Sequence, residues 1–325
     1  MFSENAQDLI LIKVCLSQDN RIIISILVPL NYWYTKNMVT TIQLICLPQW
    51  MNKELSTAAD IVVRHSYGLD LPTYSLEDIW WMPQEIAARV LFSMEKQNLV
   101  IPRLTSPGPE WLTKVPKEYS GRIVNLYTVK EIQADPELIT SGWWKSAEAK
   151  IESFVSKYRT TEELLEDIIE SNLPEDSLLQ VSHRKFNIAR EFRFYIKDKK
   201  VLTGSLYLDK TNPEEELTYY DGATATLGQY EAAADYAALC AENLEAPPAY
   251  VLDIVETVEG EFCVLEANMV FASAWYDSNI NNVVEALIRS ERVTDQEYEK
   301  WKWVPDSYHQ NKVEKKFILE QSTAS

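Results

Sequence analysis

Cysteine, histidine and glycine are scarce in this chain of 325 residues, which has 4 Cys, 3 His and 8 Gly. The four cysteines lie far apart and form no C-x-x-C motif: Cys15, Cys46, Cys240 and Cys263. This spacing argues against a structural zinc site and against a disulfide framework, and it is typical of a protein in the reducing cytoplasm. The few, scattered histidines argue against a histidine-based metal site. With only 8 Gly and 14 Pro, the composition also excludes a low-complexity or fibrous protein.

Basic residues are in the minority, with 31 Lys and Arg against 49 Asp and Glu and a formal net charge of -18. This balance argues against nucleic acid or an anionic membrane as the main partner, because both bind basic surfaces. A phosphate-bearing ligand stays compatible with the charge if cations gather locally at its site. Hydrophobic residues make up 46% of the chain, so it can bury a large core, and its length predicts two or three lobes.

Long hydrophobic runs are also missing. The apolar run from Ile22 to Val28 is too short to span a membrane and does not have the build of a signal peptide. It is either an extra strand or part of a non-native extension upstream of a true start at Met38. We favour the second interpretation and treat residues 1–37 as an N-terminal extension, because residues 39–47 are typical of a first strand.

Residues 38–120 are predicted to form a small N-terminal α/β lobe. Residues 39–47 and 61–63 have strand patterns, and the segment from Ser75 to Gln97 has helical spacing, with Ser75 as a suitable N-cap. The pair Trp80 and Trp81 falls on this predicted helix and is assigned to the core rather than to a ligand.

Alternating strands and helices continue through the rest of the chain. The expected strands are Arg122–Tyr127, Gly142–Lys145 and Leu178–Val181; the expected helices are near Lys130, Thr161–Asn172 and Gln229–Asn243; the expected hairpins are Arg190–Leu208 and Tyr250–Asn268. On the first hairpin, alternation divides the residues between two faces: Phe192, Phe194 and Ile196 against Glu191, Arg193 and Tyr195.

The second hairpin places two carboxylates together. If Glu259 and Gly260 form a two-residue turn, Asp253 lies directly opposite Glu266, and Asn268 shares the face of Glu266. Two like charges opposite each other destabilise a strand pair, so they must be solvated, share a proton or share a cation. Asp, Glu and Asn offer the oxygen ligands that magnesium takes, commonly together with substrate phosphates. The alternative is a pair of carboxylates that is merely solvated at a strand end.

The order of four sequence blocks resembles ATP-grasp enzymes, and more narrowly a clade of predicted ATP-grasp amide ligases of bacterial gene clusters and phages. The blocks lie between about residues 120 and 290: Trp143-Trp-Lys145 with Lys150, Leu178-Leu-Gln-Val181, Glu191-Phe-Arg193-Phe, and Asp253 with Glu266-Ala-Asn268 and a following Ala272-Ser-Ala-Trp-Tyr276. Two departures concern the lysine block, where Ser146 replaces the usual proline and Ser153–Val155 replaces a glycine-containing turn.

The resemblance implies that cationic residues meet the phosphates of ATP. Lys145 and Lys150 would contact the α- and β-phosphates, and Arg193 would hold the γ-phosphate or an acyl-phosphate. Glu191 would orient Arg193 or contact the ribose, and the backbone of Val181 would contact adenine. The alternatives are solvated lysines, a cross-strand ion pair for Arg193, and a core position for Val181.

The same resemblance implies that Asp253, Glu266 and Asn268 hold one or two magnesium ions between the β- and γ-phosphates. Tyr276 and Ser273 would then either line an acceptor pocket or belong to a structural turn. Catalytic roles fall to Arg193 and Lys145.

The fold class implied is α/β (α+β), an ATP-grasp architecture with a small N-terminal α/β lobe and two ATP-clamping lobes built on antiparallel sheets. The ATP-grasp domain would span 121–300, with a small ATP-binding lobe at 121–183 and a metal-binding catalytic lobe at 184–300, before a tail at 301–325.

The implied activity is an ADP-forming carboxylate–amine ligase with ATP and Mg²⁺ as cofactors and with small-molecule or peptide carboxylates and amines as substrates. A homodimer, a cytoplasmic location, and no nucleic-acid or membrane partner complete the expectation. The alternatives are an ATP-grasp small-molecule kinase and a non-catalytic nucleotide-binding module.

Overall fold

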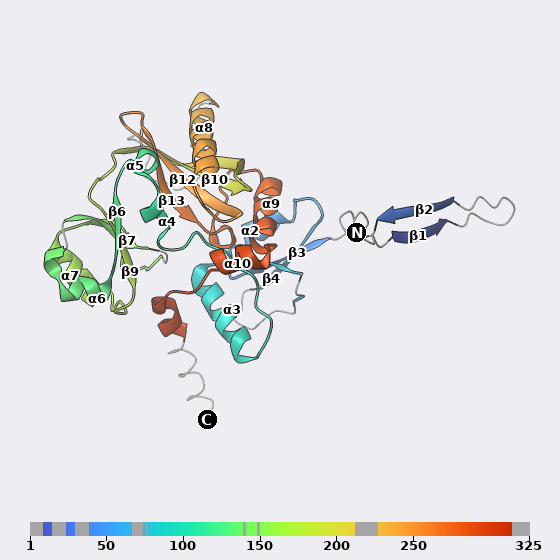
Figure 1. Cartoon of the computed structure of the whole chain (residues 1–325), viewed down its shortest axis with the longest axis horizontal. Helices are drawn as coiled ribbons and strands as arrows, with labels where there is room; N and C mark the ends of the chain where they lie inside the picture. The colour runs from blue at the N-terminus through green and yellow to red at the C-terminus, as the bar shows by residue number, and fades with distance from the viewer. Residues whose placement is uncertain are drawn as a thin grey trace, which may run out of the picture.

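The computed structural model describes residues 9–14, 24–29, 39–66, 74–75, 77–138, 141–147, 150–211 and 227–313. Within these ranges no helix has the length and apolar character needed to cross a membrane. The described residues form four sheets, and the three larger ones belong to successive lobes (Figure 1). Residues 212–226 and 314–325 lie outside the described residues.

A separate two-stranded antiparallel sheet precedes the lobes. It pairs β1 (Leu9–Val14) with β2 (Ile24–Pro29). The apolar run after Arg21 therefore forms a strand, as one of the two interpretations expected. Its status as native or non-native is untested, and the rest of the first 38 residues lies outside the described part of the chain.

The N-terminal lobe is a parallel three-stranded sheet in the order β4-β3-β5. Its elements are β3 (Thr40–Ile45), α2 (Gln49–Leu55), β4 (Ile61–Ser66), β5 (Ile79–Trp81) and α3 (Gln84–Lys96). The first two strands occur where the sequence predicts them. Because the intervening segments carry the chain back to the same end of the sheet, the strands run parallel.

The helix predicted from Ser75 to Gln97 is wrong in its first part. Residues 79–81 form a strand beside β3, and the helix starts only at Gln84, after Pro83. Proline is compatible with a helix start and not with a helix interior. Trp80 and Trp81 are 2% and 1% exposed, so adjacent side chains on opposite strand faces are both buried, and their core assignment is confirmed.

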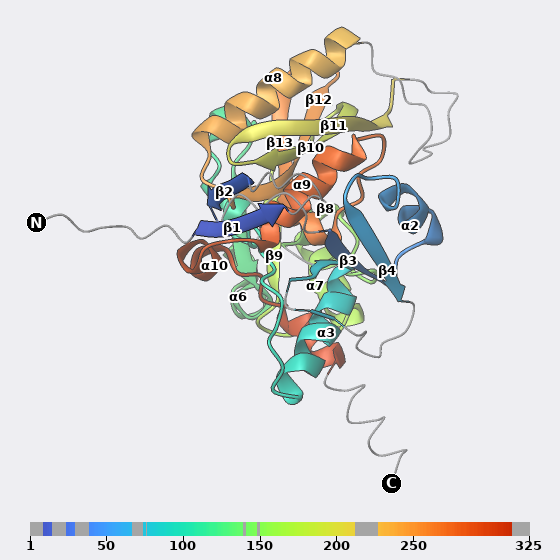
Figure 2. The same cartoon turned by 90° about the vertical axis from the view of Figure 1, so that its right-hand side faces the viewer.

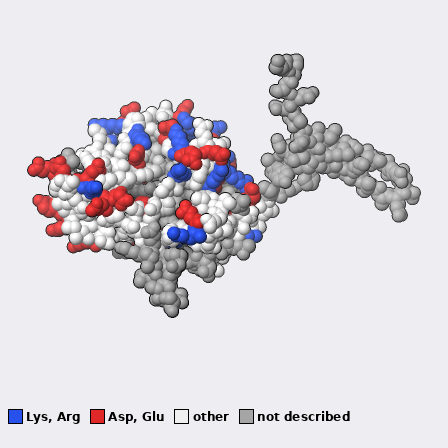
Figure 3. Space-filling view, turned by 60° about the horizontal axis from the view of Figure 1, so that its bottom comes forward, with Lys and Arg blue, Asp and Glu red and all other residues white. Residues whose placement is uncertain are grey.

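The small lobe is an antiparallel sheet in the order β6-β9-β7-β8. Its elements are β6 (Val124–Thr128), α6 (Val129–Ala134), β7 (Gly142–Ser146), β8 (Lys157–Arg159), α7 (Thr161–Glu170) and β9 (Leu178–Ser182), with a short 3-10 turn at Pro136–Leu138. Capping boxes at Thr128 and Thr160 begin the two helices. Exposed acids follow on α7, in keeping with the acidic side chains at the left end of the molecule in Figure 3.

A buried arginine fixes the β8 side of this lobe. The Arg159 side chain is 1% exposed; it pairs with Asp167 at 2.6 Å and donates to the carbonyls of Trp144 and Val155 at 3.0 and 2.7 Å. Its neighbour Lys157 pairs with the same carboxylate at 2.8 Å, but its side chain is 47% exposed.

We expect Arg159→Met to lower the free energy of unfolding by about 3 kcal/mol or more, because it leaves Asp167 and two carbonyls without their buried donor. Lys157→Met is the matched control, with an expected loss below about 1 kcal/mol, since an exposed ion pair contributes little. Urea unfolding of the two variants measures the difference. Equal losses of unfolding free energy in the two variants would show that the buried Arg159 contributes no more stability than the exposed Lys157.

The large lobe is an antiparallel sheet in the order β11-β10-β12-β13. Its strands are β10 (Ile188–Lys197), β11 (Lys200–Asp209), β12 (Ala249–Thr257) and β13 (Phe262–Asn268); its helices are α8 (Leu227–Asn243) and α9 (Ile280–Glu291). The two hairpins and the helix predicted from Gln229 are confirmed. Short helices connect or flank the lobes: α4 (Trp111–Lys114), α5 (Lys117–Ser120), α10 (Asp295–Trp301) and a 3-10 turn at Val270–Ala272.

Different helices cover the two faces of this sheet, α8 on one and α9 on the other (Figure 2). Phe192, Phe194 and Ile196 pack with the alanine-rich side of α8, as the alternation on β10 predicts. Tyr195 lies on the other face, in the cluster that contains residues of α9 and of the N-terminal lobe. Arg193 belongs to this second face, so the polar side of β10 is directed toward the junction with the N-terminal lobe.

Candidate functional site

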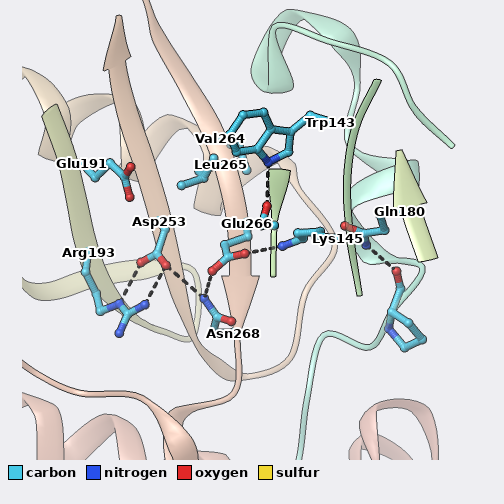
Figure 4. Close-up of polar contacts among 12 residues, drawn as sticks. Trp143, Lys145, Gln180, Glu191, Arg193, Asp253, Val264, Leu265, Glu266 and Asn268 are labelled. Carbon is cyan, nitrogen blue, oxygen red and sulfur yellow. Dashed lines mark hydrogen bonds and ion pairs between the residues drawn. The ribbon is translucent and has the colours of Figure 1, made fainter. Parts of the chain in front are cut away.

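A row of polar residues crosses the large-lobe sheet, one from each strand. Arg193 on β10 pairs with Ser205 on β11 and with Asp253 on β12, and Asp253 pairs with Glu266 on β13. Lys145, at the end of β7 in the small lobe, extends the row by an ion pair with Glu266 (Figure 4). The site therefore joins two lobes through a row in which two cations, Lys145 and Arg193, flank two adjacent carboxylates.

The predicted pairing of Asp253 with Glu266 is confirmed, but the predicted turn is wrong. The strands are connected by a three-residue loop at residues 258–260, in which Gly260 has a φ of +81°, as a left-handed loop position requires. Ile254 consequently pairs with Val264, one residue away from the register expected. A β-bulge then shifts the register by one residue between Ile254 and Asp253, and this shift restores the expected pair.

Asp253 is fully buried, with an exposed fraction of 0%. Arg193 binds it through two parallel hydrogen bonds, Nε to Oδ1 at 2.9 Å and Nη2 to Oδ2 at 2.8 Å. Burial raises the pKa of Asp253, while the Arg193 guanidinium acts in the opposite direction. The alternative of a carboxylate solvated at a strand end is therefore excluded for Asp253.

Glu266 differs from Asp253 in its surroundings, since its side chain is 25% exposed. Burial acts to raise its pKa, but the Lys145 ammonium, the Asn268 amide and the Lys150 charge together outweigh burial and hold the pKa of Glu266 well below its usual range. Lys150 is exposed, and its charge also lowers the pKa of both carboxyls, which indicates that it lies within electrostatic reach of the pair. Both predicted lysines therefore act on this site.

Asn268 connects the two carboxylates. Its Nδ2 atom donates to Asp253 Oδ2 and to Glu266 Oε1, at 3.0 Å in both cases. The three predicted metal ligands thus converge on one face of the β12–β13 hairpin (Figure 4). Rotating the amide would present Oδ1, in place of Nδ2, to the same position between the carboxylates.

Two stacked tyrosines lie beside the Arg193 guanidinium. Its carbon lies 5.3 Å from the ring centres of Tyr207 and Tyr276, whose rings stack 5.0 Å apart, and Nη1 donates to the carbonyl of Ala274 at 3.2 Å. Tyr276 adopts a φ of +50°. The side chain of Tyr276 therefore faces the site.

Ser273 has a different surrounding from Tyr276. Its hydroxyl donates to the carbonyl of Met269 at 2.6 Å, and its side chain is buried. Ser273 thus belongs to the turn that follows β13, which was one of the two interpretations given for it.

Glu191 does not bond to Arg193, which corrects one of its two predicted roles. Its Oε2 accepts a hydrogen bond at 2.5 Å from the hydroxyl of Tyr207, whose ring lies beside the Arg193 guanidinium. Burial raises the pKa of Glu191, the Tyr207 hydroxyl lowers it, and the nearby Asp253 and Glu266 charges raise it further. Tyr207 itself was not predicted, because it lies at a register shift of β11 that strand alternation does not reveal.

The adenine contact predicted for the Val181 backbone is not available where the structure places this residue. Val181 lies in β9, between β6 and β7, where it pairs with Asn125 on one side and Trp144 on the other. Its backbone groups belong to the sheet, and its side chain is 1% exposed in the small-lobe core. The predicted alternative, a core valine, describes its position. The connection between the small and large lobes begins after Ser182, at residues 183–187.

Magnesium fits the donor set. Two carboxylates and one amide converge on a point that a positively polarised N–H group occupies in the structure. Among the described residues no cluster of three or more His, Cys, Asp or Glu side chains could hold a metal alone. Magnesium needs only a few protein oxygens when phosphates supply the others, so a set of two carboxylates and one amide is suitable.

Comparison with known proteins gives a family match and several distant structural likenesses. Residues 119–286 match a family model described as an ATP-grasp domain, the second family of its clade. No curated protein matches the sequence.

Similar solved structures include D-cycloserine synthetase DcsG, at 12% identity and a TM-score of 0.48, covering 78% of this chain and 100% of that one. They also include a D-alanine-D-alanine ligase from Coxiella burnetii, at 12% identity and a TM-score of 0.43, covering 88% of this chain and 100% of that one. A RimK domain ATP-grasp protein from Sphaerobacter thermophilus is 11% identical with a TM-score of 0.42, covering 78% and 97%.

The matched region contains β6 to β13 and most of α9, and therefore every residue of the row described above. It spans just over half of the 325 residues. The resemblance seen in the sequence blocks is thereby confirmed: the chain belongs to the ATP-grasp superfamily, in the clade family whose model it matches.

Proposed function

We propose that this protein is an ATP- and magnesium-dependent ligase that joins a carboxylate to an amine and releases ADP and phosphate. The observation that carries the proposal is the convergence of Asp253, Glu266 and Asn268 on one sheet face of an ATP-grasp domain, with Arg193 and Lys145 bonded to the two carboxylates. The formal charge of the whole chain is -18, so a polyanionic nucleotide needs such local cations.

The metal role falls to the acidic middle of the row, between Arg193 and Lys145. Asp253, Glu266 and Asn268 would hold magnesium, which when bound neutralises charge on the β- and γ-phosphates during phosphoryl transfer. In the structure Lys145 and Arg193 neutralise the same carboxylates. We infer that the lysine exchanges its carboxylate partner for a phosphate oxygen when nucleotide and metal enter together.

The cations have distinct tasks because of their surroundings. Lys145 is 27% exposed on its side chain and comes from the small lobe, so it can turn to the α- and β-phosphates without leaving a buried gap. Lys150 is exposed and would add charge to the same phosphates. Arg193 is 6% exposed and lies beside the stacked rings of Tyr207 and Tyr276, so it would act as a fixed donor toward the transferred phosphoryl group through its remaining N–H groups.

The proposed reaction has two steps. An oxygen of the substrate carboxylate attacks the γ-phosphorus, the bond from that phosphorus to the β–γ bridging oxygen breaks, and ADP leaves with an acyl-phosphate formed. The amine nitrogen then attacks the acyl carbon, the bond to the phosphate oxygen breaks, the amine loses a proton, and phosphate is released. Positioning and electrostatic stabilisation supply most of the catalysis in the first step.

The test measures ADP release with pools of amino acids and short peptides as carboxylates and with hydroxylamine as a general amine. We expect ADP release that requires a carboxylate, together with a hydroxamate product, because hydroxylamine captures an acyl-phosphate. A stable phosphorylated product that needs no amine would instead indicate a small-molecule kinase. Magnesium-dependent ATP binding without turnover across all pools would indicate a non-catalytic nucleotide-binding module.

A further inference from the structure

The β-bulge in β13 decides which face Glu266 occupies. Between the loop and the bulge, Ile254 pairs with Val264; beyond it, Asp253 pairs with Glu266, so Leu265 is the extra residue. If the register next to the loop continued unchanged, Asp253 would face Leu265, and Glu266 would point to the opposite face of the sheet. The carboxylate pair therefore depends on a local irregularity that the turn alone would not produce.

One side chain from outside the hairpin holds this irregularity. Arg122 Nη2 donates to the carbonyl of Leu265 at 2.7 Å, and Nη1 donates to the carbonyl of Val264 at 3.4 Å. Since β13 is at the edge of its sheet, these outward carbonyls lack a ladder partner on that side. The fork of the guanidinium thus binds the two residues immediately before Glu266.

Arg122 is itself fixed in place. It is 8% exposed, its guanidinium lies 4.6 Å from the ring centre of Phe186, and its carbonyl accepts the hydroxyl of Ser120 at 2.6 Å. Burial lowers its pKa to about 10, so it stays cationic at neutral pH. Phe186 belongs to the connection between the small and large lobes, and its ring therefore links Arg122 to that connection.

Gly121, the residue before Arg122, allows its segment to lie close to β13. Gly121 has a φ of +63°, and a Cβ atom there would lie 2.5 Å from Cys263 Sγ on β13. Any larger residue would push the segment away from the strand. The close contact and the guanidinium fork together act on three successive residues of β13, from Cys263 to Leu265.

We propose that Arg122 is a positioning residue that maintains the Leu265 bulge and thereby aims Glu266 at the metal position beside Asp253. The inference rests on the proposed function, because it assigns a purpose to the direction of Glu266. It predicts that removing the Arg122 guanidinium lowers the affinity for magnesium more than it lowers the affinity for the nucleotide.

The test is a magnesium titration of the binding of a non-hydrolysable ATP analogue, measured by calorimetry on the full chain. For Arg122→Met we expect the half-saturating magnesium concentration to rise about tenfold or more, as for other residues that orient metal ligands. Binding of the analogue at saturating magnesium should change little. Arg122→Lys should recover part of the loss, since an ammonium can still donate to one of the two carbonyls.

Arg184→Met is the matched control. Arg184 lies over the same ring of Phe186 at 5.2 Å, but it donates to Gly121 and Glu261 and not to Val264 or Leu265. The half-saturating magnesium concentration of Arg184→Met should stay near that of the unchanged protein.

Three outcomes would contradict the inference in different ways. If the unchanged protein binds the analogue with magnesium and Arg122→Met and Arg122→Lys both titrate like it, Arg122 does not position Glu266. If both variants are only less stable to heat while their magnesium midpoint is unaltered, Arg122 has a structural role alone. Absence of magnesium-dependent binding by the unchanged protein would contradict the proposed function, and the inference with it.

Discussion

Asp253→Asn and Glu266→Gln are each expected to reduce ATP turnover by about 100-fold or more and to remove the magnesium dependence of nucleotide binding. Both changes keep the size of the side chain and remove one negative charge from the point where Asn268 meets the two carboxylates. A fixed charge that stabilises a phosphoryl-transfer transition state has an effect of this order. Calorimetric titration with an ATP analogue, with and without magnesium, measures the binding part, and ADP release measures the turnover.

The two variants should differ in stability, and this difference separates folding from function. Glu266 is 25% exposed, so Glu266→Gln should leave the fold nearly as stable as before. Asp253 is fully buried against Arg193, so Asp253→Asn leaves a buried guanidinium without its counter-charge.

Glu256→Gln is the control for both variants. Glu256 lies on β12, three residues after Asp253, and pairs with Arg190 at 2.9 Å, outside the row that crosses the sheet. The ATP turnover of Glu256→Gln should equal that of the unchanged protein. Unaltered magnesium dependence in both Asp253→Asn and Glu266→Gln would contradict the metal assignment.

The central feature of the site could be predicted from the sequence, although part of the reasoning that led to it was wrong. A two-residue turn places Asp253 opposite Glu266 by simple counting. The structure uses a three-residue loop and then a bulge at Leu265, and the two deviations cancel. Glycine at position 260 indicates a turn but not its length, and no local pattern marks a bulge whose carbonyls are bound by a residue more than a hundred positions away.

Other parts of the chain were beyond prediction for similar reasons. The segment Ile79–Trp81 has helical spacing with the residues after it, yet the neighbouring strand β3 and the break at Pro83 make it a strand. Val181 lies inside its sheet because strands on both sides pair with it, and a single sequence does not reveal which strands are interior. In contrast, alternation along β10 assigned both of its faces correctly, because the two faces pack against different helices.

The strongest effect on stability is expected at the pair of Arg193 with Asp253. Arg193→Met should lower the free energy of unfolding by about 3–5 kcal/mol, because it leaves the fully buried Asp253 carboxylate without its partner. Burial acts to lower the pKa of Arg193, but the charge and hydrogen bonds of Asp253, together with Tyr207 and Tyr276, outweigh burial and hold that pKa well above its usual range, so the arginine is charged. The two parallel bonds at 2.8 and 2.9 Å have the bidentate geometry of an arginine–carboxylate pair.

The control for this prediction is the neighbouring Arg190 on the same strand. Its side chain is 15% exposed, and it pairs with Glu256 and Asp209, whose side chains are 16% and 20% exposed. Arg190→Met should lower the free energy of unfolding by less than Arg193→Met does, because water can reach the Glu256 and Asp209 carboxylates that lose their partner. Urea unfolding followed by tryptophan fluorescence compares the two variants.

The double variant Arg193→Met with Asp253→Asn distinguishes a structural ion pair from a paired functional site. Removing both charges should recover a large part of the stability lost in Arg193→Met, since no uncompensated charge remains buried. ATP turnover should not recover, because the metal ligand and the phosphate-binding cation are both absent. A double variant whose loss of stability equals the sum of the two single losses would show that the two side chains do not depend on each other. Recovery of turnover together with stability would show that the pair holds the sheet and takes no part in catalysis.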